Sequence, residues 1–228
     1  GNWNPISVVS DTYGTLKTST AYEELKDQLD QTGVDYSLRS LYVSGDGGVQ
    51  FLNIQINDAQ DLNSLPDKIS LVVQFMSSVD GTKAHSINLM AYNHTTDALF
   101  DFSGSVQKLQ ARHTTTIGDR SIDFIPAIAK IVKNWNENII PFMKLMMDSS
   151  FDRNMALELV ETVSDDAGIG ERHRNKIVEL YGTQKIRTNE TGHNLYRVNV
   201  AIGQYIADNL GDKPEVQQRF TKGLGRAV

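Results

Sequence analysis

The first half of the chain alternates between short runs of β-branched or aromatic residues and turn-forming residues. Such runs predict strands, and we expect four of them at 36–43, 49–56, 69–76 and 86–92. An Asp-Gly-Gly sequence at 46–48 is a hairpin signal between the first two. Strands joined directly by turns are typical of an antiparallel meander, because parallel neighbours need a long crossover connection.

Other segments of the first half extend this pattern. Residues 6–10 predict a further short strand, and residues 21–31 predict a helix whose apolar side chains recur at helical spacing. Gly33 follows that helix in the position of a C-cap. Residues 105–109 and 112–117 are expected to supply one or two more strands.

After Gly118 the apolar residues recur every three or four positions, which indicates amphipathic helices. A long helix is expected from about 122 to 147, and Pro141 should kink or split it. Three shorter helices are expected, at 150–163, 170–181 and 193–209. The predicted fold class is therefore α+β, with an antiparallel meander-type sheet in the first half packed with a helical second half.

This organisation is interpreted as a single α+β domain over residues 1–228, which is β-rich over residues 1–118, helical over residues 119–210 and ends in a basic tail, residues 211–228. A division into two domains near Gly118 is the alternative. The sequence contains no cysteine, which excludes disulfides, thiolate metal sites and a cysteine nucleophile. The absence of cysteine also fits a reducing compartment. No apolar run approaches the roughly 18 residues of a membrane helix, so we expect no membrane partner.

Charge is distributed unevenly along the chain. The net charge of -6 argues against a uniformly basic nucleic-acid binder. Residues 171–228, however, hold ten Lys and Arg against six Asp and Glu, whereas residues 1–170 hold 12 against 22. A polyanion is therefore expected to meet the C-terminal portion, unless these are ordinary solvated helix faces. The candidate nucleic-acid contacts are Arg172, Arg174, Lys176, Arg197, Arg219 and Lys222.

Two groups of charged residues invite a chemical interpretation. Arg112 and His113, followed by three Thr, suit phosphate or carboxylate contacts, although an edge strand with a solvated polar side would have the same pattern. Arg172 and Arg174 are expected at the start of a helix, where positive charge is unfavourable. The simpler explanation for this placement is that the two arginines pair with Asp165 and Asp166. The other explanation is that they contact an anion. The sequence lacks a phosphate-binding loop and a His-Glu-x-x-His motif, so neither a cofactor nor a metal is predicted.

Several short segments together resemble the phage/plasmid-like domain of unknown function 932 family. In chain order they are Val8-Val9-Ser10-Asp11-Thr12-Tyr13, Leu38-Arg39-Ser40-Leu41, Ser78-Val79-Asp80-Gly81-Thr82, Ala91-Tyr92-Asn93, Arg112-His113-Thr114 and Asn194-Leu195-Tyr196-Arg197-Val198-Asn199-Val200-Ala201. Two departures stand out: Val79 occupies the place of the family's usual His, and Ala91-Tyr92-Asn93 keeps the Asn of a Cys-x-Asn motif without its Cys.

The resemblance implies a phage, prophage or plasmid gene expressed in the cytoplasm of a bacterial host, and it implies no established reaction. It marks a candidate functional cluster of Asp80, Gly81, Asn93, Arg112, His113 and Thr114. Our leading hypothesis is a nucleic-acid-associated binding protein of phage or plasmid DNA metabolism that acts as a homo-oligomer and is non-catalytic or only weakly catalytic. The alternatives are a metal-assisted phosphodiester hydrolase that uses His113 and Asp80, and a non-catalytic structural or interaction protein of a phage.

Overall fold

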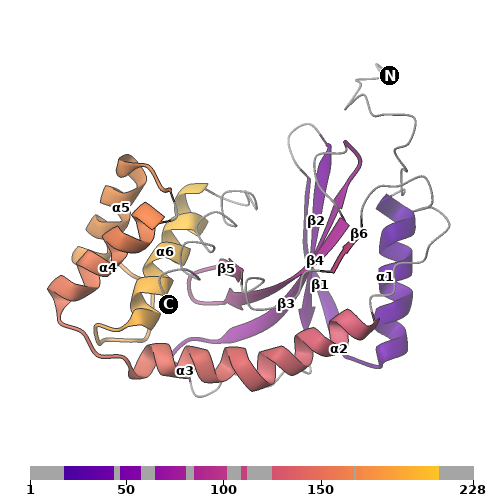
Figure 1. Cartoon of the computed structure of the whole chain (residues 1–228), viewed down its shortest axis with the longest axis horizontal. Helices are drawn as coiled ribbons and strands as arrows, with labels where there is room; N and C mark the ends of the chain where they lie inside the picture. Colours follow the sequence, from indigo (N-terminus) through magenta and orange to yellow (C-terminus); the bar gives the residue numbers. More distant parts are fainter. Residues whose placement is uncertain are drawn as a thin grey trace. The chain divides into compact units, whose positions relative to one another are not determined.

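The computed structural model describes residues 18–43, 47–57, 65–80, 85–101, 109–111, 125–166 and 168–210. It confirms the predicted α+β class, since an antiparallel meander in the first half is followed by helices in the second (Figure 1). The strands are β1 (Tyr36–Val43), β2 (Val49–Ile56), β3 (Ile69–Ser78), β4 (His85–Asn93), β5 (Ala98–Asp101) and β6 (Leu109–Ala111). The helices are α1 (Thr18–Thr32), α2 (Ile125–Asn134), α3 (Ile140–Asp148), α4 (Arg153–Asp166), α5 (Glu171–Gly182) and α6 (Leu195–Leu210).

The sheet has the strand order β1-β2-β3-β4-β5, and β6 pairs with β4. Strand β4 has two partners on the same side, because β6 pairs with its beginning and β5 with its end. Strand β5 follows a tight turn and was not predicted from the sequence, since four residues are too few to establish an alternating pattern. Residues 6–10 and 112–117, for which strands were also predicted, lie outside the described residues.

The chain divides into two compact units. Unit 1 comprises Gly1–Asp58, Val72–Leu89 and Val106–Lys133, and unit 2 comprises Ala59–Leu71, Met90–Ser105 and Asn134–Val228. Both units contain strands and helices, so their limits do not follow the predicted boundary at 118.

The core of unit 1 lies between α1 and one face of the sheet. Ala21, Leu25 and Leu29 follow one another every four residues and are almost fully buried, as the helical period requires. Tyr22 packs edge-on against Phe75 of β3, with 5.6 Å between the ring centroids. The helix ends at the predicted position, where Gly33 has a positive φ of 70°.

On the other face of unit 1, four polar side chains form a ladder across neighbouring strands. Asn53 donates to Ser40 over 2.9 Å, Gln74 donates to Asn53 over 3.1 Å, and Asn88 donates to Gln74 over 3.5 Å. Asn53, Gln74 and Asn88 are almost fully buried. Because a shift of one residue would turn each amide to the opposite face, the ladder favours a single strand register.

In unit 2, α6 presents an apolar face that matches the sequence prediction. Val198, Ile202, Tyr205 and Ile206 are all buried. Gly203 lies on this helix so close to β5 that a Cβ atom there would overlap the Phe100 ring. The glycine therefore allows the helix and strand to approach each other closely.

The segment 125–148 shows how the chain accommodates Pro141. A five-residue π-helical turn, Trp135–Ile139, separates α2 from α3. The N–H of Ile140 donates to the carbonyl of Trp135, five residues earlier. Because proline lacks an N–H and clashes with the carbonyl four residues before it, the wider turn just upstream is where the predicted interruption occurs.

Within the stretches of chain that the structure describes, no helix is both long enough and apolar enough to cross a membrane.

Candidate functional site

Asp80 lies just after β3, where it packs against the turn between β1 and β2. Ser78 donates a hydrogen bond to its carboxylate over 2.6 Å, and the N–H of Val79 donates to the carbonyl of Gly48 over 2.9 Å. A Cβ atom on Gly48 would overlap the Asp80 carboxylate. The turn glycine predicted from the sequence therefore also makes room for this side chain.

Asn93 is fully buried at the end of β4 and shapes the turn that leads to β5. Its side-chain oxygen accepts hydrogen bonds from the backbone N–H groups of Thr95 and Thr96, over 2.8 and 3.1 Å. Its amide donates to Asp67 over 3.2 Å. Both ends of the amide are thus used in the fold, in the manner of an Asx turn.

The predicted functional cluster is only partly described. Asp80 belongs to unit 1 and Asn93 to unit 2; Asp80 precedes β4 and Asn93 ends it. Gly81, Arg112, His113 and Thr114 lie outside the described residues. A shared site for these six residues stays a prediction.

Asp67 is a buried carboxylate that the sequence interpretation missed. Besides Asn93, it accepts hydrogen bonds from the Thr188 hydroxyl over 3.0 Å, the Asn189 N–H over 3.3 Å and the Tyr196 hydroxyl over 2.8 Å. Burial, together with the charge of Asp67, raises the pKa of Tyr196 above its ordinary value. Asp67 therefore joins the loop before α6, and α6 itself, to the end of β4.

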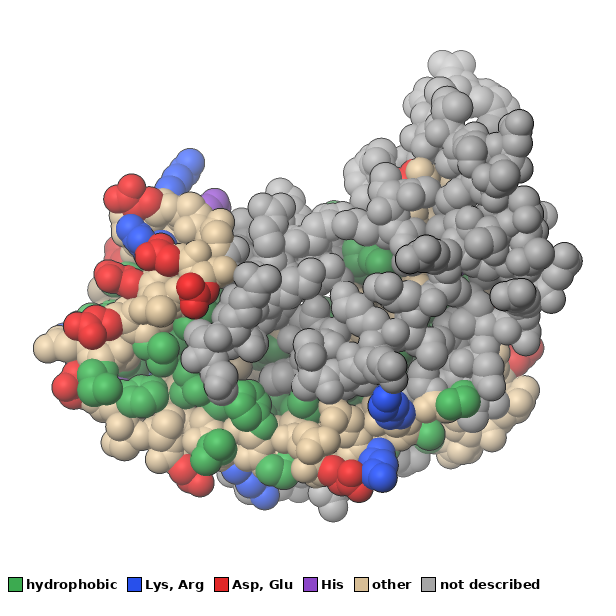
Figure 2. Space-filling model, viewed as in Figure 1, with side chains coloured by type: hydrophobic (Ala, Val, Ile, Leu, Met, Phe, Trp, Pro, Cys, Tyr) green, Lys and Arg blue, Asp and Glu red, His purple; other side chains and the backbone are tan. Residues whose placement is uncertain are grey.

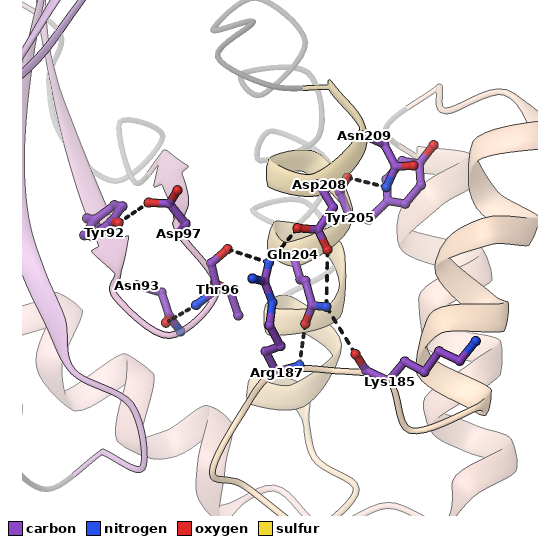
Figure 3. Close-up of polar contacts among 10 residues, drawn as sticks. All are labelled: Tyr92, Asn93, Thr96, Asp97, Lys185, Arg187, Gln204, Tyr205, Asp208 and Asn209. Carbon is purple, nitrogen blue, oxygen red and sulfur yellow. Dashed lines mark hydrogen bonds and ion pairs between the residues drawn. The ribbon is translucent and has the colours of Figure 1, made fainter.

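A second polar network of unit 2 lies beside the β4–β5 turn (Figure 3). Arg187 donates to the carbonyl of Thr96 over 3.4 Å and pairs with Asp208 of α6 over 2.5 Å. The Gln204 side chain accepts from the N–H of Arg187 and donates to the carbonyl of Lys185 over 3.1 Å. These contacts attach the segment before α6 to that helix and to the turn.

His94, one of the five histidines in the chain, is engaged in a hydrogen bond with Ser70 over 2.8 Å and packs edge-on against Tyr92. Among the described residues, no group of three or more His, Asp or Glu side chains is arranged to hold a metal ion.

The first two turns of α5 carry three basic residues, Arg172, Arg174 and Lys176, and one acidic residue, Glu171, at the first helical position. Gly170 precedes this helix with extended backbone and supplies no side-chain cap. Arg174 pairs with Asp165 over 2.6 Å, which is the pairing that the sequence suggested. Arg172 and Lys176 are exposed, four residues apart on one side of the helix, and neither pairs with a carboxylate among the described residues.

Arg197 has a different environment from the other predicted nucleic-acid contacts. It is only 5% exposed, and its guanidinium donates to the carbonyls of Thr191 and Gly192 over 2.9 and 3.0 Å. The same group lies over the ring of Tyr181, 5.5 Å from the centroid. These contacts hold the loop before α6 in place. Because the side chain is buried, we do not include Arg197 among the candidate surface contacts. Arg219 and Lys222 lie outside the described residues.

The surface over α4 and α5 carries charges of both signs (Figure 2). The candidate anion contact is a local feature of α5, namely the uncapped end of the helix with Arg172 and Lys176.

No family model matches this chain, and no curated protein or solved structure matches it either. The resemblance to the domain of unknown function 932 family consequently stays a prediction.

Proposed function

We propose that this protein is a nucleic-acid-associated binding protein and that the N-terminal turn of α5 contacts phosphate groups. The observation that carries the proposal is the exposed pair of Arg172 and Lys176 beside a helix end whose N–H groups receive no side-chain cap. Residues 171–228 carry more basic than acidic residues, which adds a long-range attraction for a polyanion.

Placing positive charge at the start of a helix costs free energy. A helix N-terminus carries a partial positive charge, so a cation in the first turn, where Arg172 lies, is unfavourable. Like charges four residues apart cost a further ~0.2–0.5 kcal/mol. Asp165 pairs with Arg174, and Glu171 places one negative charge in the first turn, but neither Arg172 nor Lys176 forms an ion pair with a described carboxylate. A phosphate would offset both costs, because backbone N–H groups and Arg side chains at a helix N-terminus bind anions.

The biological setting of the proposal comes from the sequence resemblance: phage or plasmid DNA metabolism in a bacterial cytoplasm, with the chain acting as a homo-oligomer. Sedimentation equilibrium of the purified protein tests the oligomer directly.

The binding experiment uses fluorescence anisotropy with labelled single- and double-stranded DNA at low salt. We expect the wild-type chain to bind, and we expect Arg172→Glu combined with Lys176→Glu to weaken binding at least about tenfold, since phosphate contacts dominate such affinity.

The matched control is Lys144→Glu combined with Lys185→Glu. Both lysines are exposed in unit 2, and the change in net charge is the same. Absence of binding by the wild-type chain, or equal losses in the two double variants, would show that α5 is not a phosphate contact.

A further inference from the structure

The outer strand of unit 1 lies at the edge of the sheet. Strand β1 is the first in the strand order and, among the described strands, pairs with β2 alone. It is eight residues long and contains no proline, and Arg39 is its one charged residue. Natural proteins usually protect such edges with short strands, proline, β-bulges or several charges, because exposed N–H and C=O groups accept another strand. Of these devices, β1 has one charge and one register shift, between Leu38 and Ser40.

Three large apolar side chains stand exposed along this strand: Leu38 is 66% exposed, Leu41 53% and Val43 45%. They pair with Ile54, Leu52 and Gln50 of β2, which alternate along that strand and so point to one face of the sheet. The register shift between Leu38 and Ser40 is what keeps Leu38 and Leu41 on the same face. We call Leu38, Leu41 and Val43 the β1 stripe.

Negative charge borders the β1 stripe at the end where the strand begins. Tyr36, on the same face as the stripe, donates a hydrogen bond over 2.7 Å to Asp30 of α1. Asp27 lies near enough that its charge, like that of Asp30, helps to raise the pKa of the Tyr36 hydroxyl. Helix α1 carries four acidic residues against one lysine, Lys26, which pairs with Asp30.

A second copy of this chain fits the β1 stripe less well than a peptide does. Three partly exposed side chains offer far less than the ~800 Å² per partner of a standard interface. Antiparallel pairing of two β1 strands centred on Arg39 would also place the two Arg39 side chains directly opposite each other, and like charges across a strand pair are destabilising. An added peptide strand needs only main-chain hydrogen bonds and pockets for alternate side chains.

We propose that β1 accepts an extended segment of a partner protein as an additional strand. Apolar side chains of that segment, at alternate positions, cover Leu38, Leu41 and Val43. A Lys or Arg at one end lies beside Asp27 of the acidic helix α1, whose Asp30 already pairs with Lys26. This inference is independent of nucleic-acid binding, because the strand and α1 both belong to unit 1 whereas α5 belongs to unit 2.

A library of random decapeptides, selected on the full chain, tests this proposal. We expect the selected peptides to share alternating apolar residues with Lys or Arg at one end. The affinity of a selected peptide, measured by fluorescence anisotropy, should fall at least about tenfold for Leu38→Lys combined with Leu41→Lys. Asp27→Lys should weaken the same peptide by a smaller factor that shrinks as salt is added.

Leu145→Lys is the control, because Leu145 of α3 is 65% exposed and lies in the other unit. It should leave peptide affinity unchanged. The proposal is overturned if the library yields no binder, or if selected peptides bind the Leu38 and Leu41 double variant as tightly as wild type. It is equally overturned if wild-type chains self-associate in a way that Leu41→Lys abolishes, since the occupant would then be a second copy.

Discussion

At the scale of single residues, Asp67 has the clearest structural consequence. It is 1% exposed, and its carboxylate accepts hydrogen bonds from four donors in unit 2. We predict that Asp67→Ala lowers the free energy of unfolding by about 3 kcal/mol or more, because it leaves several buried donors without an acceptor. Urea unfolding measures this change.

Asp148→Ala is the comparison for that variant, since Asp148 is an exposed residue at the end of α3. We expect its effect to stay within about 0.5 kcal/mol. A similarly small effect for Asp67→Ala would mean that the four contacts do not hold the loop and α6 in place.

Tyr22 gives a prediction about alkaline pH. Burial raises the pKa of its hydroxyl from 10.0 to about 12. As pH rises through this interval, the unfolded chain releases the proton first, so Tyr22 lowers the stability of the folded state between pH 10 and pH 12. In Tyr22→Phe the free energy of unfolding should therefore decline less steeply with pH over that range.

Urea unfolding of wild type and Tyr22→Phe at a series of alkaline pH values measures the difference. Tyr36, Tyr181, Tyr196 and Tyr205 also have raised pKa values, so both proteins lose stability, and the difference in slope isolates Tyr22. If the free energies of unfolding of the two proteins declined in parallel with pH, the raised pKa would not belong to Tyr22.

Residue-level prediction from sequence was limited by distance along the chain. Asn93 was singled out by its place in a short segment, and the structure shows that it bonds to residues two and three positions later. Asp67 carried no such signal, because three of its donors, Thr188, Asn189 and Tyr196, come more than 100 residues later. Arg197 was grouped with surface cations because charge in a sequence does not reveal burial.

At the scale of elements, the contact between α6 and β5 depends on Gly203. A Cβ atom at this position would overlap the Phe100 ring and lie 3.1 Å from the Cβ of Ala98. Alanine favours helix by about 1 kcal/mol over glycine, but overpacking costs about 1–3 kcal/mol. We predict that Gly203→Ala lowers the free energy of unfolding by about 1–2 kcal/mol in thermal or urea unfolding.

Gly182→Ala provides the matched substitution. The nearest atom to its added Cβ would be a guanidinium nitrogen of Arg153 at 3.6 Å, an ordinary contact. This variant should be neutral or slightly stabilising. If both variants behaved alike, close approach of α6 to β5 would not be the reason for the glycine.

Most elements were predictable because their signals are local. The strands β1 to β4 and the helices α1, α4, α5 and α6 match predicted segments to within a few residues. Periodicity failed for β5, which is too short, and for the π-helical turn Trp135–Ile139, whose apolar spacing resembles that of an α-helix. Pro141 did signal an interruption, although the altered hydrogen bonding lies in the turn before it.

At the scale of the whole molecule, the order of the elements was sufficient to predict the α+β class. The division into two units was not predictable, because β3 and β4 each contribute residues to both. That division arises from contacts between distant segments, such as those of Asp67 with the loop before α6, which leave no periodic pattern in the sequence.

Charge at this scale also limits what kind of nucleic-acid binder the chain can be. A net charge of -6 argues against a uniform attraction to a polyanion, so the proposed binding would depend on a few local contacts. The number of phosphate contacts made by α5 should then appear directly in the salt dependence of binding, because each neutralised phosphate releases counterions.

The central claim is that the start of α5 contacts phosphate groups. The slope of log affinity against log salt concentration for duplex DNA tests this claim most directly. Replacing Arg172 and Lys176 together by Gln should make the slope shallower by about 1.8, which is the contribution of two phosphate contacts. The control pair, Lys144→Gln with Lys185→Gln, should leave the slope as it is in the wild-type chain. An unchanged slope in the Arg172 and Lys176 variant would contradict phosphate binding at the start of α5.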